Sequence, residues 1–536
     1  MKITLLILLC GFQLTAQVVR IPNSYFGQHD TGSTSTFPLP ISYGNFRFWD
    51  SGPNVQWQGM HVCNSTTANC LANPATYTSL TTSGSGAYLD NVLANLYSSG
   101  VNDVLYTGGR VPSWAAGATS YSPACIYGNG TCVLPAEMSV DGSCSGTIGS
   151  NTAACSIWDT FWHLLAVHAN NSTFLQTHAH IKYWEPWNEW FEDNLVSASV
   201  SSTEVNATYA QMLRMTEDMR CLIKGVGTIH NYPASGSSAS CSSYLSALGW
   251  SAADPAALIV APDGNPTLTP QFLYCTYSPL NDNGSSTTCT WPPSGGNTAN
   301  CNSSSCWGSQ AVDVIADHFY YSQYTPEIMV GSTGQVTQLK GRLSTTDSAK
   351  MLMCGECSGG FPATGPNIWN DNYSEAASVA RGLALYWSAG ITNFQWYAYN
   401  GSDQLGSDSG VLTPAGIAWN TDVKWLRGAT PAGSPFCTNS GTVYTCKLIE
   451  ANGLRGLLVW DSQYGPGGTS SPSNCTTAAT PTICGSTSYS VPTGYSTDWL
   501  DMIGTKHSFT STITIGAVPI LVEGTGMAVD PDIQVF

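Results

Sequence analysis

The amino-acid sequence predicts an α/β fold, a (β/α)8 TIM barrel with a C-terminal β-sandwich domain. Between Tyr25 and about Tyr397, short β-like runs alternate with helix-like stretches, which is typical of a parallel sheet with helical crossovers. Eight strand candidates can be counted in this region, and eight parallel strands close a barrel of this kind. After about residue 430 the helical periodicity disappears, and alternating runs typical of strands replace it.

The eight predicted barrel strands are short and are separated by segments long enough to hold helices. They are Tyr25–His29, Asn45–Trp49, Asp103–Tyr106, Ile181–Trp184, Ala257–Ala261, Val312–His318, Met351–Gly355 and Thr392–Tyr397. Helical spacing is clearest in two of the intervening segments. One stops at Gly100 and has its apolar residues three and four positions apart, at Leu89, Val92, Leu93 and Leu96. The other can be capped by Ser374 and stops at Gly390.

Two further segments, 117–156 and 262–310, differ from ordinary connections between strands and helices. Both are rich in Cys, Gly and Ser, and both are far longer than the usual βα loops of about 2–6 residues. We expect them to be disulfide-stapled excursions over the functional face of the barrel.

The C-terminal part has the sequence signals of antiparallel strands. Thr442–Glu450 and Leu454–Trp460 flank Asn452-Gly453, a dipeptide typical of hairpin turns, and Ser511–Ile515 alternates between apolar and polar residues. We therefore place the barrel in residues 17–429 and the β-sandwich in residues 430–536.

The N-terminus has the features of a signal peptide. Met1 and Lys2 precede an apolar run, Ile3–Leu9, that is too short to span a bilayer, and Leu14-Thr15-Ala16 offers a small-residue cleavage site. We expect residues 1–16 to be removed and the mature chain to be secreted, either outside the cell or into a periplasm. No later stretch approaches the roughly 18 apolar residues of a membrane helix.

The cysteine count agrees with secretion. Loss of Cys10 with the signal peptide leaves 18 of the 19 cysteines, an even number in a chain bound for an oxidising compartment. Many of them have a near neighbour in sequence, which suits local disulfides: Cys63 and Cys70, Cys125 and Cys132, Cys144 and Cys155, Cys437 and Cys446, Cys475 and Cys484.

The composition excludes some classes of partner. Only 10% of the residues are charged, the net charge is −17, and the sequence has no basic patch, which argues against nucleic acids and anionic membranes as partners. The 18 Trp and 25 Tyr supply aromatic rings that can stack on sugars. These features favour a neutral substrate. The oligomeric state cannot be read from the sequence.

Two glutamates stand where a barrel carries its chemistry. Glu189 ends the run Trp184-Glu185-Pro186-Trp187-Asn188-Glu189 after the fourth predicted strand, and Glu356 follows the seventh. The carboxyl ends of barrel strands hold the reacting groups of such enzymes. Cleavage of a glycosidic bond requires one carboxylic acid to protonate the leaving oxygen and one carboxylate to attack the anomeric carbon. The two positions therefore predict glycosidase chemistry.

The sequence at these two strands resembles that of clan A glycoside hydrolases, and the run from Trp184 to Glu189 looks like a Trp-Glu-x-Trp-Asn-Glu form of glycoside hydrolase family 39 and its relatives. The resemblance implies that Glu189 is the acid/base and Glu356 the nucleophile. It also implies that Asn188 holds the 2-hydroxyl of the sugar in the −1 subsite.

The same resemblance extends to other strands of the barrel. Arg47, in Phe46-Arg47-Phe48-Trp49-Asp50, matches the strand-two arginine that contacts the nucleophile in the clan. His318 and Tyr320, in His318-Phe319-Tyr320, resemble the strand-six residues near the nucleophile. Trp396 matches the aromatic platform under the −1 sugar. A sandwich after the barrel also agrees with family 39.

The predicted function is a retaining glycoside hydrolase that cleaves β-glycosidic bonds of oligosaccharides or polysaccharides by double displacement and needs no cofactor or metal. Carboxyl groups about 5–5.5 Å apart give retention, whereas about 6.5–9.5 Å gives inversion. Two alternatives stay open: a non-catalytic carbohydrate-binding protein on a glycosidase barrel, and a transglycosylase that uses the same covalent intermediate.

Other interpretations of individual residues are weaker. Glu185 is the rival acid, with a structural pairing to a barrel arginine or lysine as its simpler role. Cys354 and Cys357 form a C-x-x-C pattern, but it follows a seventh strand and not a first βα unit, which argues against a thiol redox site. His178 and His180 have no third ligand at a telling spacing, so we predict no metal site.

Overall fold

A computed structural model of the chain describes residues 20–30, 37–49, 51, 55–60, 80–82, 89–112, 115, 135, 157–189, 209–230, 238–274, 306–321, 325–359, 372–400, 403–465 and 483–527. The predicted signal peptide and most of the segment 117–156 lie outside these residues. Within the described ranges, every helix is too short or too polar to cross a bilayer.

The predicted barrel is confirmed. Eight strands pair in parallel and close in the order β1-β10-β9-β8-β7-β4-β3-β2. Each strand overlaps its predicted position: β1 Phe26–His29, β2 Asn45–Phe48, β3 Asp103–Thr107, β4 His180–Glu185, β7 Leu258–Gly264, β8 Val314–His318, β9 Met351–Cys357 and β10 Asn393–Trp396.

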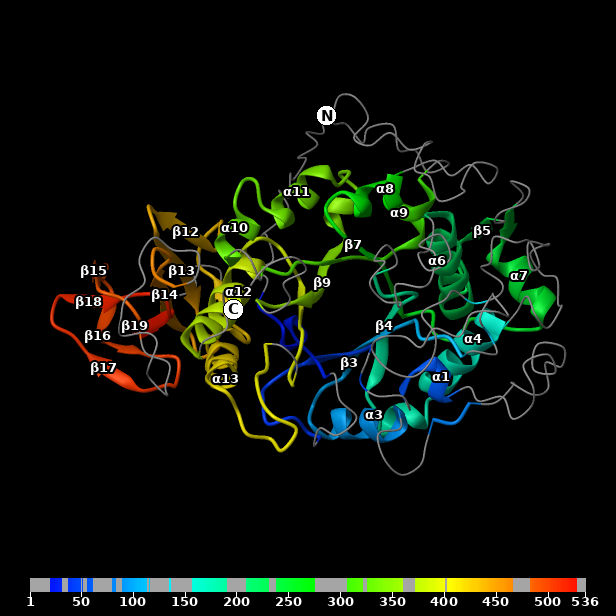
Figure 1. The fold of residues 1–536 in the computed structure, drawn as a ribbon, viewed down its shortest axis with the longest axis horizontal. Coiled ribbons are helices and arrows are strands. Elements are labelled where there is room, and N and C mark those ends of the chain that lie inside the picture. Colours follow the sequence, from blue (N-terminus) through cyan, green and yellow to red (C-terminus); the bar gives the residue numbers. More distant parts are fainter. Residues whose placement is uncertain are drawn as a thin grey trace, which may run out of the picture.

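Helices surround the barrel, as Figure 1 shows. The two helices with the clearest spacing are present: α3 runs Leu89–Ser98 ahead of Gly100, and α12 runs Asn372–Ser388, beginning two residues before Ser374. The other α-helices are α1 Trp57–Met60, α4 Ile157–Ala169, α6 Tyr209–Lys224, α7 Cys241–Leu248, α8 Leu268–Tyr274, α9 Trp307–Ala311, α10 Pro326–Val330, α11 Gln335–Arg342 and α13 Pro414–Leu426. Short 3₁₀ turns form η1 Asn23–Tyr25, η6 Phe174–Gln176 and η9 Asp347–Ala349.

The barrel interior is filled in layers, so the barrel is a packed core and not a channel. One apolar layer consists of buried residues from five strands, Leu105, Tyr183, Val260, Ala316 and Met353, and Val314 of β8 packs with them from the layer below. Because side chains alternate along a strand, the interior residues two positions further on belong to the next layer. On β3, β4 and β8 these residues are Thr107, Glu185 and His318, which are all polar and buried. The apolar layer thus forms the floor of a polar cluster.

Strand β9 departs from regular pairing at one residue. Its register shifts relative to β8 between the partners of Asp317 and His318, and relative to β10 between the partners of Phe394 and Trp396. Both shifts are explained by one extra residue near Gly355, which is a β-bulge. A bulge re-aims the side chain that follows it and is common beside active sites. Here the following residue is Glu356.

After residue 430, the described residues form strands and no helix, as expected. One sheet has the order β11-β13-β14-β19-β16-β17 with β12 paired to β13, and a second sheet pairs β15 with β18. The strands are β11 Thr430–Pro431, β12 Cys437–Ser440, β13 Val443–Ile449, β14 Leu454–Asp461, β15 Thr487–Ser490, β16 Tyr495–Leu500, β17 Lys506–Ser508, β18 Thr512–Ile515 and β19 Ile520–Met527. The predicted hairpin is β13–β14, with Gly453 at a φ of 86°.

Apolar residues from the two C-terminal sheets share one cluster. Ile513 and Ile515 of β18 pack with Leu457 and Val459 of β14 and with Ile520 and Val522 of β19. The sheets lie beside α12 and α13 in Figure 1. Arg381 of α12 is fully buried and donates to the backbone carbonyls of Ala517 and Tyr464. These hydrogen bonds connect the C-terminal sheets to a helix of the barrel.

Three disulfides can be placed among the described cysteines. Cys437 and Cys446 are bonded across the β12–β13 pair, as their spacing predicts. Cys221 and Cys241 join α6 to α7 over 20 residues, a pairing that local spacing does not reveal. Cys354 and Cys357 are bonded to each other on either side of Gly355 and Glu356, so the C-x-x-C pattern forms a closed disulfide around the bulge. A small hairpin, β5 Thr228–His230 with β6 Ser238–Ser240, precedes α7.

Candidate active site

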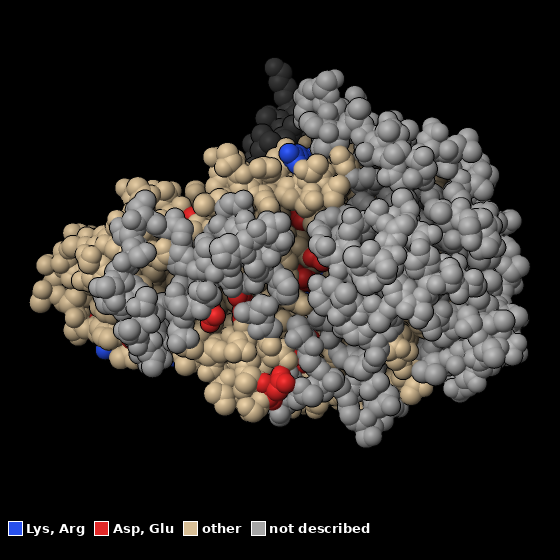
Figure 2. Space-filling view, viewed as in Figure 1, with Lys and Arg blue, Asp and Glu red and all other residues tan. Residues whose placement is uncertain are grey.

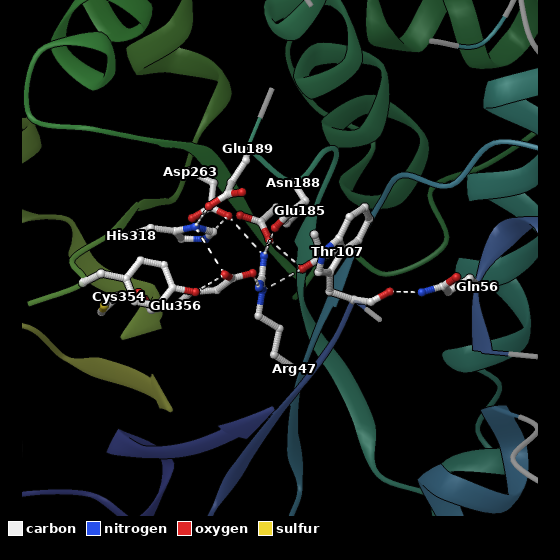
Figure 3. Close-up of polar contacts among 12 residues, drawn as sticks. Arg47, Gln56, Thr107, Glu185, Asn188, Glu189, Asp263, His318, Cys354 and Glu356 are labelled. Atoms are coloured by element: carbon white, nitrogen blue, oxygen red, sulfur yellow. Dashed lines mark hydrogen bonds and ion pairs between the residues drawn. The ribbon is translucent and has the colours of Figure 1, made fainter. Parts of the chain in front are cut away.

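Arg47 lies at the centre of the polar cluster and is fully buried (Figure 3). Its guanidinium faces three carboxylates from three other strands. Nη2 is 3.1 Å from Glu185 Oε2 and 3.1 Å from Asp263 Oδ2, and Nη1 contacts Glu356 Oε1. A buried arginine requires such partners, because an unpaired charge in the interior is strongly unfavourable. Glu185 thus has the structural pairing that was the simpler interpretation of that residue.

Glu356 is held by two donors. Arg47 donates to one carboxylate oxygen, and the Tyr320 hydroxyl donates to the other. Burial and the charge of Glu356 raise the pKa of Tyr320 well above its usual value, so the phenol keeps its proton and remains a donor. The carboxyl group of Glu356 is only slightly exposed. Two donors on two oxygens fix the orientation of this carboxyl group.

Glu189 has a different environment. It follows β4 with a φ of 43°, a left-handed conformation that is rare for residues other than glycine and that often marks functional positions. Its side chain is 22% exposed, and its Oε1 is 2.7 Å from His318 Nδ1. Burial raises the pKa of Glu189 above 4.5, although His318 opposes this shift. Glu189 therefore holds a proton to higher pH than an ordinary glutamate.

His318 lies between carboxylates. Its Nε2 is 2.5 Å from Asp263 Oδ2, and its Nδ1 is 3.6 Å from Glu356 Oε2 in addition to the contact with Glu189. Burial alone would lower the pKa of this imidazole, but the charges of Asp263 and Glu356 outweigh burial and raise the pKa well above 6.5. His318 is therefore an imidazolium at neutral pH.

The two buried carboxylates next to Arg47 also differ. Burial and the charge of Asp263 raise the pKa of Glu185 to about 8, despite Arg47 and a 2.6 Å hydrogen bond from Thr107. Burial would raise the pKa of Asp263 as well, but His318 and Arg47 hold it below 3.8. At pH 7 Glu185 is thus largely neutral and Asp263 is ionised, which limits the negative charge in the cluster.

The predicted acid/base and nucleophile face each other. Glu189, His318 and Glu356 each offer one atom within 4.8 Å of the others, so the nearest carboxylate oxygens of the two glutamates are no further apart than that. Three such atoms are also close enough to hold a metal ion. Both nitrogens of His318, however, already lie close to carboxylate oxygens, Nε2 at 2.5 Å from Asp263 and Nδ1 at 2.7 Å from Glu189, so a metal ion would compete with these contacts. The arrangement is best described as an acid–base cluster.

The remaining predicted residues fall into two groups. Asn188 belongs to the cluster, because its Oδ1 accepts a 2.6 Å hydrogen bond from Arg47 Nη2. Trp396 is not brought to it. Its ring is 1% exposed, packs against Phe394 and Trp419, and donates its indole N–H to the Asp403 carbonyl. The residue therefore faces the helices outside the barrel.

The next residue, Tyr397, does lie beside the cluster. Its ring is 6.3 Å from that of Tyr320 and 4.6 Å from that of His29, with edge-to-face geometry in both pairs. Alternation along β10 explains the difference, since neighbouring residues of a strand point to opposite sides of the sheet. The sequence shows an aromatic pair at this strand end but not which of the two rings points inward.

Sequence reasoning also missed Asp263 and Thr107. Asp263 lies in Ala261-Pro262-Asp263-Gly264, just beyond the predicted end of the fifth barrel strand. The rule that barrel chemistry gathers at the carboxyl ends of strands could have singled it out. Thr107 likewise ends β3 and donates to Glu185.

Acidic side chains are prominent on the face of the molecule shown in Figure 2. Red Asp and Glu atoms are visible at several places among the described residues, whereas blue Lys and Arg atoms are visible only near the top and at the lower left of this view. This charge distribution agrees with the low content of basic residues in the chain.

Comparisons with known proteins find likeness only among solved structures, since no family model and no curated protein matches the chain. The structural neighbours are glycoside hydrolases. One is the catalytic domain of GH30 xylanase C from Talaromyces cellulolyticus, with 10% identity over 94% of this chain and 98% of that chain and a TM-score of 0.48. Another is CelM2, a bifunctional glucanase-xylanase from a metagenome library, with 12% identity, 94% and 96% coverage and a TM-score of 0.47. A third is a glycoside hydrolase family 44 xyloglucanase from Paenibacillus polymyxa, with 10% identity, 94% and 97% coverage and a TM-score of 0.46.

Proposed function

We propose that this chain is a secreted, retaining glycoside hydrolase that cleaves β-glycosidic bonds of oligosaccharides or polysaccharides. One observation carries the proposal. Glu189 and Glu356 have carboxylate oxygens within 4.8 Å, yet one carboxyl group has a raised pKa and the other is held by two donors. This upper limit on the distance between the nearest oxygens is compatible with the roughly 5–5.5 Å separation of the two carboxyl groups in retaining enzymes.

In the first step, Glu189 donates its proton to the glycosidic oxygen while Glu356 attacks the anomeric carbon. The bond to the leaving group breaks, and an ester forms between the sugar and Glu356. Arg47 and Tyr320 hold the Glu356 carboxylate for attack from one face. Loss of its proton leaves Glu189 as a carboxylate, which His318 stabilises by donating Nδ1–H.

In the second step, Glu189 takes a proton from a water molecule, and the water oxygen attacks the anomeric carbon. The ester bond breaks, Glu356 is again a carboxylate, and the sugar leaves with its original configuration. The esterified Glu356 carries no charge, so its effect on the pKa of Glu189 disappears in the intermediate. The pKa of Glu189 then falls, which suits its role as a base.

Two further residues contact the substrate in this proposal. Because Arg47 occupies Oδ1 of Asn188, the amide can offer its NH₂ group to the sugar 2-hydroxyl. We assign the aromatic platform under the sugar to Tyr397 in place of Trp396, because Tyr397 lies beside Tyr320. The two-sheet cluster after residue 430 supports a β-sandwich there, and the motif at Glu189 supports a relationship to family 39.

The experiment that tests this function is product analysis on a panel of aryl β-glycosides of xylose, glucose, mannose and arabinose. Proton NMR of the first product should show the β-anomer, and Glu356→Gln should reduce the rate on the order of 10⁴-fold. An α-anomer as first product would contradict retention. Undiminished hydrolysis by Glu356→Gln would contradict the nucleophile, and binding of sugars without hydrolysis would favour a carbohydrate-binding protein.

A further inference from the structure

Asp263 lies close to both Arg47 and His318 in the cluster. It is fully buried at the end of β7, with a φ of 54°, so its backbone is held in the left-handed region. A single carboxylate oxygen, Oδ2, lies 3.1 Å from Arg47 Nη2 and 2.5 Å from His318 Nε2. Arg47 is the cation at the proposed nucleophile, and His318 is the cation at the proposed acid/base.

We infer that Asp263 is a positioning residue that joins these two cations and, through His318, sets the protonation of Glu189. The inference rests on the proposed function for the role of Glu189 in the reaction. Asp263 itself contacts neither predicted catalytic glutamate through a hydrogen bond among the described residues, and it acts only through its neighbours. Its effect is therefore on geometry and charge and not on the reacting atoms.

The geometry of the imidazole supports the first part of the inference. The two ring nitrogens of His318 face different carboxylates, with Nε2 toward Asp263 and Nδ1 toward Glu189 (Figure 3). Because Asp263 is also tied to Arg47, it cannot follow the ring if the ring turns. The contact at Nε2 therefore keeps Nδ1–H directed at the Glu189 carboxyl group.

The charges around His318 support the second part. The charged and titratable groups that face it are Glu189 after β4, Asp263 on β7, Asp317 beside it on β8, Tyr320 after β8 and Glu356 on β9. Asp263 makes the largest contribution to the raised pKa of His318 among them, against the effect of burial. Asp317 contributes less, because burial raises its own pKa well above 3.8 and keeps it largely neutral. Asp263 thus keeps the imidazolium charged.

The bulge on β9 provides independent support. A Cβ atom at Gly355 would lie 2.6 Å from Asp263 Oδ1 and 3.2 Å from the ring of His318. Both groups therefore pack directly against the backbone of β9, immediately before Glu356. Only glycine leaves room for the Asp263–His318 pair at this point. The absence of a side chain at residue 355 therefore allows the two groups to approach the backbone of β9.

Replacing Asp263 with Asn tests the inference, because Asn keeps the shape and removes the charge. The pKa of His318 should fall once its main anionic partner is lost, so the ring becomes neutral in the assay range. Glu189 then loses a cation at 2.7 Å, and its pKa should rise. The Asp263 charge by itself raises the pKa of Glu189, so its loss acts to lower that pKa. This effect is smaller than the effects of His318 and Glu356. We expect the alkaline limb of kcat/KM to move up by about one pH unit.

The decisive measurement is histidine NMR on the full chain labelled with ¹³C at the histidine rings, with the His318 signal assigned by its loss in His318→Gln. In the wild-type chain His318 should remain an imidazolium at pH 8, and in Asp263→Asn it should be neutral there. Asp461→Asn is the matched control, since Asp461 is equally buried and its pKa is also held below 3.8, but it lies on β14, outside the cluster. It should change neither the His318 titration nor the pH profile.

Three results would overturn the inference. His318 could stay charged at pH 8 in Asp263→Asn, the alkaline limb could stay in place while kcat/KM merely falls, or Asp461→Asn could produce the same shifts. The NMR titration does not depend on turnover. A wild-type chain without glycosidase activity would contradict the proposed function. The titration would still decide whether Asp263 keeps the His318 ring protonated.

Discussion

Arg47 and Glu356, which are 309 residues apart in the chain, form a buried ion pair across the mouth of the barrel. They come from β2 and β9, and β1 and β10 separate these strands in the sheet. The contact therefore reaches over the polar layer and does not follow the barrel wall. Because Arg47 also lies 3.1 Å from the ionised Asp263, it offsets negative charge from more than one strand of the barrel.

The first prediction concerns this arginine. Arg47→Met should lower the free energy of unfolding at pH 7 by about 3–5 kcal/mol, because it leaves buried carboxylates without their cation. Urea denaturation followed by far-UV circular dichroism measures the change. Arg427→Met is the control, since Arg427 is exposed and should cost less than about 0.5 kcal/mol. Equal stability of the two variants would mean that the cluster does not depend on Arg47.

The second prediction concerns the leaving group. Glu189→Ala should slow hydrolysis by about 10²–10⁴-fold for substrates whose leaving group needs a proton, and far less for aryl glycosides with acidic phenols. The reason is that only a basic leaving oxygen depends on the acid. Rates plotted against the pKa of the phenol should therefore become steeper in the variant. An equal loss for every phenol would assign Glu189 another role. Glu185→Gln serves as the matched variant, since Glu185 pairs with Arg47 and should not alter this slope.

The third prediction separates two neighbouring aromatic residues. Trp396→Phe should reduce the free energy of unfolding by about 1–3 kcal/mol and leave kcat/KM nearly unchanged, because its ring packs in the core beside Trp419. Tyr397→Leu should instead reduce kcat/KM roughly 10- to 100-fold, because its ring lies at the Tyr320 side of the site. Thermal unfolding and kinetics on one aryl glycoside provide both measurements. A loss of kcat/KM in Trp396→Phe but not in Tyr397→Leu would instead assign the aromatic platform to Trp396.

The fourth prediction tests the space at the bulge. Gly355→Ala should lower kcat about 10²-fold, because the added methyl group displaces Asp263 and His318 next to Glu356. Gly341→Ala is the control. Gly341 lies in α11 with nothing within 4 Å of its Cβ position, so alanine there should leave kcat unchanged and add up to about 1 kcal/mol of stability. Full activity of Gly355→Ala would show that the packing against β9 is not needed.

Some features of this protein follow from the sequence alone because they depend on local patterns. Short β-like runs between helix-like stretches locate all eight barrel strands, helical spacing locates α3 and α12, and Asn452-Gly453 locates the hairpin. Position at the ends of the fourth and seventh strands is also a local property. It makes Glu185, Glu189 and Glu356 candidates, and the resemblance of the run from Trp184 to Glu189 to clan A enzymes favours Glu189 as the acid. The expectation that the chain does not bind nucleic acids comes from its composition, because its net charge is −17.

Other features depend on contacts between distant residues and on register, which only the tertiary structure decides. The side of the sheet to which Trp396 or Tyr397 points changes with a shift of one residue, and the bulge at Gly355 becomes visible only when β9 is paired with its neighbours. Asp263 can join the two cations only because closure of the barrel brings Arg47 and His318 close to the same oxygen atom, Oδ2. The protonation of the site is likewise a tertiary property, because burial and the charges on five strands (β2, β4, β7, β8 and β9) determine it.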